Sequence, residues 1–121
     1  MDEPTETYFF NEGDSAADTG VQAGTGFVVT DGPIAGSRFL IDQTIVTLGR
    51  HPKSDFFFDD ITVSRRHAEV TLDGGQAKVK DVGSLNGTYV NLAQIDDEVF
   101  IEPGDILQIG KFKLVFFQES K

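Results

Sequence analysis

Three short stretches of this chain carry side chains suited to hold a phosphate group. The central stretch, Val63-Ser64-Arg65-Arg66-His67, places a hydroxyl and two guanidinium groups at the start of an alternating, strand-like run. An arginine fork matches phosphate oxygens bidentately, and a serine hydroxyl adds a donor that can rotate to another oxygen. Leu48-Gly49-Arg50 precedes this stretch, and Ser84-Leu85-Asn86-Gly87-Thr88 follows it. Together they predict a binding site for a phosphorylated peptide.

The composition limits what such a site can bind. The chain has 121 residues, enough for one domain with a core, and a formal net charge of −10. That charge argues against nucleic acid or an acidic membrane as the main partner, because both attract basic surfaces. Without cysteine, neither a disulfide framework nor a thiolate metal site is expected. We expect a cytoplasmic monomer without metal or cofactor, since no secretory signal and no membrane-spanning apolar run is evident.

Residues 1–26 are interpreted as a disordered acidic tail. They hold six carboxylates and no Lys or Arg, so they carry −6 of the net charge and leave −4 for the rest. Small residues and glycines without a helical or strand period favour a flexible linker over residues 11–26. The exception is Thr5-Glu6-Thr7-Tyr8-Phe9-Phe10, where two threonines precede three adjacent aromatic side chains. Such a cluster is typical of a segment that has a binding partner.

From Phe27 onward, short runs rich in β-branched and aromatic residues alternate with turn residues. Strands are predicted at 27–30, 37–41, 44–48, 56–58, 67–72, 76–81, 88–90, 105–109 and 112–117. Asp73-Gly74-Gly75 predicts a hairpin turn, and no window of helical length has a clean 3.6-residue period. Many short strands separated by turns indicate an all-β antiparallel sandwich or barrel, whose loops gather at the ends and carry function.

The three polar stretches, with Asn91 after them, resemble the signature of forkhead-associated (FHA) domains. The resemblance covers roughly residues 27–118, and the stretches occur in the expected order. It implies a two-sheet antiparallel β-sandwich that binds phosphothreonine peptides through loops at one end. By position, the phosphate contacts would be Arg50, Ser64 and Arg65, and Asn86 would hydrogen-bond the peptide backbone. The residues implied to support the site are Gly49, His67, Gly87 and Thr88.

The residue types agree with these implied roles. Gly49 and Gly87 permit backbone conformations that a Cβ would strain, and Asn86-Gly87 is a strong turn former. An asparagine amide offers both a donor and an acceptor, which reading a peptide bond requires. Arg66 is interpreted as an exposed strand charge and not as a phosphate contact.

The tail and several runs of the domain resemble one subgroup, the small actinobacterial FHA regulators of 2-oxoglutarate and glutamate metabolism. This group includes inhibitors of 2-oxoglutarate dehydrogenase and regulators of glycogen accumulation. The resemblance implies that a serine/threonine protein kinase phosphorylates a tail threonine. The phosphorylated tail would then bind its own FHA site and stop the protein from binding metabolic enzymes, of the 2-oxoglutarate dehydrogenase or glutamate dehydrogenase type.

The phosphorylated threonine is the point at which the tail departs from that subgroup. Relatives place two adjacent threonines after a glutamate, whereas here Glu6 separates Thr5 from Thr7. Alignment on the aromatic residues makes Thr7 the acceptor and Phe10 the residue three positions after it, which FHA domains commonly read. Thr5 remains the alternative acceptor.

Two hypotheses from other classes were weighed against this one. In the first, the chain is a constitutive adaptor whose FHA site docks a phosphorylated kinase or another protein in trans while the tail is inert. In the second, Ser64, His67 and Asp81 form a hydrolytic triad. The second is disfavoured because Ser and His three residues apart at a strand entry are not placed as nucleophile and base. The acidic pairs and triplets Asp59-Asp60 and Asp96-Asp97-Glu98 lack calcium-loop spacing and are interpreted as solvated turns.

Overall fold

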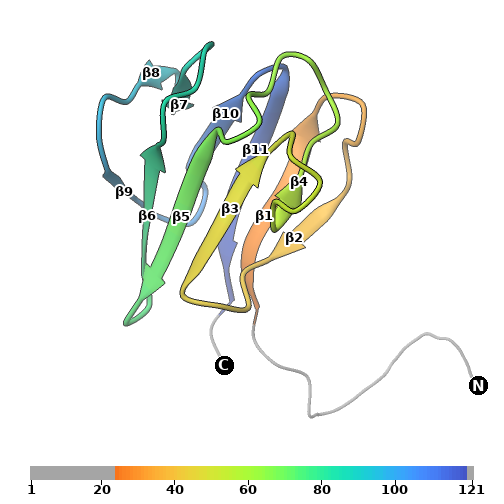
Figure 1. Cartoon of the computed structure of the whole chain (residues 1–121). Helices are drawn as coiled ribbons and strands as arrows, with labels where there is room; N and C mark the ends of the chain where they lie inside the picture. Colours follow the sequence, from red (N-terminus) through yellow and green to blue (C-terminus); the bar gives the residue numbers. More distant parts are fainter. Residues whose placement is uncertain (1–23, 120–121) are drawn as a thin grey trace, which may run out of the picture.

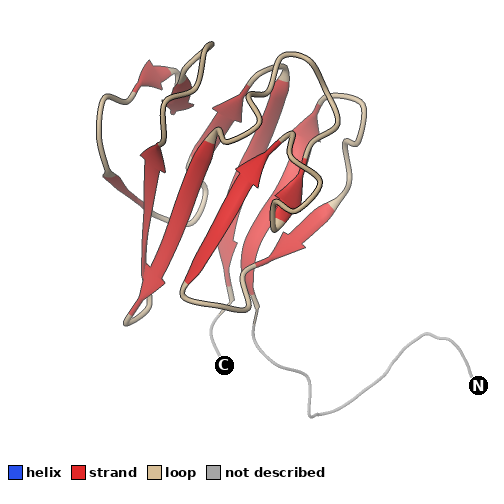
Figure 2. Ribbon diagram, in the orientation of Figure 1, coloured by secondary structure: helices blue, strands red, loops and turns tan. Residues whose placement is uncertain are grey.

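The computed structural model describes residues 24–119 as two β-sheets packed against each other (Figure 1). One sheet has the strand order β2-β1-β11-β10-β7-β8, and the other has the order β4-β3-β5-β6-β9. The described residues form strands joined by loops and turns, without a helix (Figure 2). The strands are β1 (Thr25–Asp31), β2 (Arg38–Leu40), β3 (Ile45–Gly49), β4 (Phe56–Phe57), β5 (Ala68–Asp73), β6 (Gln76–Asp81), β7 (Thr88–Val90), β8 (Ala93–Gln94), β9 (Val99–Ile101), β10 (Ile106–Ile109) and β11 (Phe112–Gln118).

The predicted two-sheet β-sandwich is confirmed, with differences in detail. Leu48 pairs with Phe56 in parallel, so β3 and β4 run in the same direction, while every other pair of strands described is antiparallel. The sequence pattern does not predict β8 and β9, which have two and three residues and too little alternation to detect. Gly74 and Gly75 form the predicted hairpin turn with φ of 60° and 84°, which suits glycine.

Alternating apolar side chains from both sheets fill the space between them. Phe27 and Phe116 come from paired strands of one sheet, are at most 1% exposed, and have ring centroids 5.4 Å apart. In the run Phe56-Phe57-Phe58, the first and third side chains are buried, and Phe57 is 41% exposed. This alternation follows from the period of two in an extended chain. Burial of one such aromatic side chain contributes about 1.5–3 kcal/mol.

The loops that contain the three polar motifs emerge at one end of the sandwich (Figure 1). They follow β3, precede β5, and connect β6 to β7. The start of β1 and the end of β11, which pair with each other, lie at the opposite end. The described chain therefore begins at the end away from these loops.

Candidate functional site

Main-chain hydrogen bonds hold Arg50, Ser64 and Arg65 together although they come from two loops. The N–H of Arg50 donates to the carbonyl of Ser64 (2.9 Å), and the N–H of His51 donates to the carbonyl of Arg65 (3.2 Å). Gly49 permits this close approach, because a Cβ there would lie 2.1 Å from the carbonyl oxygen of Arg65. A side chain at position 49 would therefore push the two loops apart.

The side chains of this phosphate cluster (Arg50, Ser64 and Arg65) offer donors for an anion. The Nε of Arg50 donates to the carbonyl of Val63 (3.1 Å), which orients the guanidinium, and its Nη groups have no hydrogen-bond partner within residues 24–119. The Oγ of Ser64 accepts from the N–H of Leu85 (2.9 Å), so its own proton remains available to a ligand. Arg65 is exposed. The cluster thus offers two guanidinium groups and one hydroxyl as donors.

His67 is fully buried and joins two of the loops. The N–H of Ser64 donates to its Nδ1 (3.1 Å), and its Nε2 lies 2.9 Å from the carbonyl oxygen of Gly87. Because Nδ1 accepts, Nε2 carries the proton and the ring is neutral. Burial lowers the pKa of His67 below its ordinary value, against the opposing effects of the Gly87 carbonyl and Asp81. Both ring nitrogens are occupied by main-chain groups, so His67 is not arranged as a base for Ser64.

Asp81 organises the loop that contains Asn86. Its carboxylate accepts from the N–H groups of Gly83 (2.8 Å) and Ser84 (3.0 Å), from the hydroxyl of Ser84, and from the hydroxyl of Thr88 (2.7 Å). Partial burial would raise the pKa of Asp81, but these hydrogen bonds outweigh it and hold the pKa below its ordinary value. The sequence signal for this role was available, since an aspartate that begins a turn commonly accepts from the main chain two residues on.

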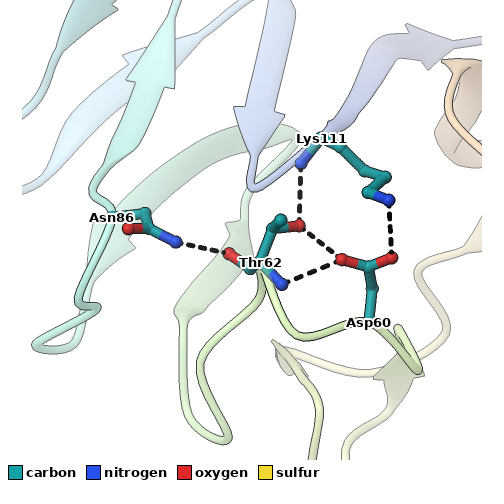
Figure 3. A network of polar contacts seen from close by, with 4 residues as sticks. All are labelled: Asp60, Thr62, Asn86 and Lys111. Carbon is teal, nitrogen blue, oxygen red and sulfur yellow. Dashed lines mark hydrogen bonds and ion pairs between the residues drawn. The ribbon is translucent and has the colours of Figure 1, made fainter.

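Asn86 is braced by a network that reaches three loops (Figure 3). Its Nδ2 donates to the carbonyl of Thr62 (3.0 Å). The N–H and hydroxyl of Thr62 donate to Asp60 (2.8 and 2.7 Å), while the N–H of Lys111 donates to the Thr62 hydroxyl (3.0 Å). The Nζ of Lys111 completes the network 3.2 Å from the other oxygen of Asp60. One amide N–H and the Oδ1 of Asn86 remain for a peptide.

This network corrects the interpretation of Asp59-Asp60 as a solvated turn. The side chain of Asp60 is only 13% exposed and pairs with Lys111. The hydrogen bonds from Thr62 lower its pKa the most, burial opposes them less strongly, and the hydrogen bond and charge of Lys111 lower the pKa further. Asp60 therefore has a structural role beside the site.

Two exposed apolar side chains lie next to Asn86. Ile61 precedes Thr62, Leu85 precedes Asn86, and each is 89% exposed. The hydrogen bond between Thr62 and Asn86 keeps the two loops adjacent. We call this pair the apolar rim. Its exposed side chains are apolar, whereas those of the phosphate cluster are charged or carry a hydroxyl.

Comparison with known proteins decides the family. Residues 46–110, more than half of the chain, match the FHA domain. The chain belongs to the FHA domain family. It is 51% identical to the glycogen accumulation regulator GarA of Mycolicibacterium smegmatis, over 93% of this chain and 78% of that protein. It is 60% identical to GarA of Mycobacterium tuberculosis, where the aligned part is 78% of this chain but only 57% of that protein.

A third relative carries a different name. The oxoglutarate dehydrogenase inhibitor of Corynebacterium glutamicum is 55% identical over 86% of this chain and 75% of that protein. These relatives are named as regulators or inhibitors, and they confirm the resemblance to the subgroup of metabolic FHA regulators.

Solved structures agree with this assignment. A protein studied for phosphothreonine-dependent FHA domain interactions has a TM-score of 0.74 and 28% identity, over 81% of this chain and 99% of that one. The FHA domain of FhaA, solved with the intracellular domain of Rv3910, has a TM-score of 0.69 and 30% identity, over 76% of this chain and 98% of that one. The FHA fold is thus shared with domains that bind other proteins.

Some predicted features lie outside the described residues. These are the acidic tail up to residue 23, with Thr5, Thr7 and Phe10. Within residues 24–119, no group of three His, Cys, Asp or Glu side chains could hold a metal ion. In the same part of the chain, no helix is long and apolar enough to cross a membrane.

Proposed function

We propose that this protein is a non-enzymatic regulator that binds a phosphothreonine peptide through Arg50, Ser64, Arg65 and Asn86. The observation that carries the proposal is the position of the phosphate cluster beside the braced amide of Asn86. Hydrogen bonds to a charged group contribute about 1.5–3 kcal/mol each, so loss of one guanidinium contact would weaken binding roughly ten- to a hundredfold.

We further propose that the natural ligand is the chain's own Thr7 after phosphorylation by a serine/threonine kinase. Phosphorylation adds about −1.5 to −2 charges and three acceptor oxygens, which the phosphate cluster can sense. In this arrangement Phe10 would lie against the apolar rim on the Asn86 side. Thr5 is the alternative acceptor.

The tail is long enough for this closure. Sixteen residues lie between Thr7 and Gly24, and a random coil of this length has an average reach of about 22 Å. β1 has seven residues, so the sandwich measures about 23 Å from one end to the other along this strand. Tethering gives effective concentrations on the order of mM. A phosphopeptide affinity in the micromolar range would then keep the switch closed.

In the open state, the loop end would bind and modulate metabolic enzymes. The name of one relative, an oxoglutarate dehydrogenase inhibitor, points to an enzyme of the 2-oxoglutarate dehydrogenase type. An enzyme of the glutamate dehydrogenase type is the other candidate and follows only from the resemblance to the subgroup. A bound phosphorylated tail would cover the phosphate cluster and the apolar rim and so prevent this contact.

The proposal is tested by competition with an external peptide. A fluorescent phosphothreonine peptide should bind the unmodified chain and fail to bind the chain phosphorylated at Thr7. Ser64→Ala should abolish peptide binding in the unmodified chain, whereas Thr5→Ala, phosphorylated at Thr7, should remain closed.

Amide NMR spectra of the two forms give the second readout. Closure shifts the signals of Arg50, Ser64 and Asn86 in a way that does not depend on concentration. If phosphorylation changes only the residues around Thr7 and the external peptide still binds, the autoinhibited switch is refuted. The constitutive adaptor would then explain the site.

A further inference from the structure

A shallow hollow adjoins the phosphate cluster on the outer face of the five-stranded sheet. It has a volume of about 340 Å³ and is lined by Thr47, His51, Lys53, Ser54 and Arg66. The N–H of Lys53 donates to the Nδ1 of His51 (2.9 Å), so in the neutral ring Nε2 carries the proton and can donate to a ligand. We call this set of residues the cationic hollow.

The two cations of the hollow have no carboxylate partner within residues 24–119. Other cations of the same part of the chain form ion pairs with acidic side chains, namely Arg38, Lys78, Lys111 and Lys113. Asp55 contacts Thr47, whose N–H and hydroxyl donate to its Oδ2 (2.8 and 3.1 Å). The lining itself holds two cations and no carboxylate, while Asp55 and Glu69 both neighbour Thr47 at its edge.

The cationic hollow and the phosphate cluster are joined through consecutive residues. His51 follows Arg50 and Arg66 follows Arg65, and the N–H of His51 donates to the carbonyl of Arg65 (3.2 Å). An extended peptide advances about 3.3 Å per residue. A ligand whose phosphate lies between Arg50 and Arg65 can therefore place a neighbouring side chain in the hollow.

The sequence around Thr7 has an asymmetry that matches the two sides of the site. Acidic residues precede Thr7 in the acidic flank (Asp2, Glu3 and Glu6), and three aromatic residues follow it. The cationic hollow contains His51 and Arg66, the chain neighbours of Arg50 and Arg65. The apolar rim adjoins the phosphate cluster through Leu85, whose N–H donates to the Oγ of Ser64. The phosphate cluster thus has a cationic neighbour for the acidic flank and an apolar neighbour for the aromatic residues.

We propose that the cationic hollow is a second subsite, which binds carboxylates of the acidic flank when phosphorylated Thr7 occupies the phosphate cluster. The proposal rests on the proposed function of the phosphate cluster and assigns Lys53 and Arg66 a role in specificity. Exposed ion pairs are weak, so the subsite adds selectivity and orientation while the phosphate supplies most of the affinity.

The test uses the full unphosphorylated chain and two synthetic peptides of residues 1–12, both phosphorylated on Thr7. In the second peptide, Asp2→Asn, Glu3→Gln and Glu6→Gln remove the charges of the acidic flank. Calorimetry should show that Lys53→Gln or Arg66→Gln weakens binding of the first peptide about two- to fivefold. Neither variant should change the affinity for the second peptide, and the difference should shrink at high salt.

The matched control is Lys80→Gln, an exposed lysine on β6 without an ion pair among the described residues. It should bind both peptides as the unmodified chain does. Equal losses for both peptides in Lys53→Gln, no loss for either, or the same loss in Lys80→Gln would overturn the subsite. If the unmodified chain binds neither peptide, the proposed function fails and the subsite with it. If it binds both equally, the subsite alone fails.

Discussion

Acidification should destabilise this fold through His67, because the ring is buried in its neutral form. A proton on Nδ1 would break the hydrogen bond from the Ser64 N–H, and the resulting imidazolium would be buried without contact with water. The pKa of His67 is lowered in the folded state by burial, whereas in the unfolded chain it is about 6.5. Between those two values the unfolded chain binds more protons than the folded chain, so stability falls as the pH decreases.

The size of this pH dependence is set by the single proton that His67 binds in the unfolded chain. The free energy of unfolding can change by at most about 1.4 kcal/mol per pH unit in this window. Urea unfolding at constant ionic strength should show a plateau above about pH 7.5 and a decline that steepens below about pH 6.5. His67→Gln should lower the plateau and remove the decline. His51→Gln, which alters the only other histidine of the chain, should retain the decline.

The same slope in the unmodified chain and in His67→Gln would refute this reasoning. Measurements stay above about pH 5, where acidic groups with lowered pKa values keep their charge and do not contribute. If His67→Gln does not fold, NMR of the histidine ring nitrogens in the unmodified chain tests the same reasoning. It should show the Nε2–H tautomer at neutral pH and no titration of His67 near pH 6.5.

Three further predictions concern single substitutions. Gly49→Ala should cost several kcal/mol of unfolding free energy in urea titrations, because its Cβ would overlap the carbonyl of Arg65; a loss below about 1 kcal/mol would contradict this. Thr88→Val should cost about 1–3 kcal/mol at neutral pH, because Asp81 loses a buried donor, and an unchanged urea midpoint would contradict it. Thr7→Glu should leave the binding of an external phosphopeptide unchanged in calorimetry, and a closed chain would contradict the prediction.

The fold was predictable wherever a strand was long enough to alternate. The runs that became β1, β5, β6 and β11 have six or seven residues each, and their inward and outward sides are distinct. β8 and β9 have only two and three residues, too few to show a period. β9 pairs with the distant β6, whereas β8 pairs with the adjacent β7. The parallel pairing of β3 with β4 also depends on the packed core and not on local sequence.

The candidate site, like the fold, could be predicted from the sequence only in part. Its proposed ligand contacts, Arg50, Ser64, Arg65 and Asn86, could be chosen from residue type and motif order. The brace formed by Thr62 and Lys111 could not, because these residues are 49 positions apart and neither is unusual in its local sequence. A motif can identify which groups meet a ligand, but the residues that hold those groups are determined by how the loops pack.

In the proposed function, geometry and not net charge lets such an acidic chain distinguish a phosphate. The tail already carries −6 before modification, and phosphorylation adds only about −1.5 to −2. The charge of the tail therefore changes by roughly a quarter to a third, too little for a switch that responds to net charge alone. What changes qualitatively is geometry, since a phosphate presents three oxygens to two guanidinium groups and a hydroxyl. A carboxylate has two oxygens and about one charge, so in the proposed switch the discrimination would come from the arrangement of Arg50, Ser64 and Arg65.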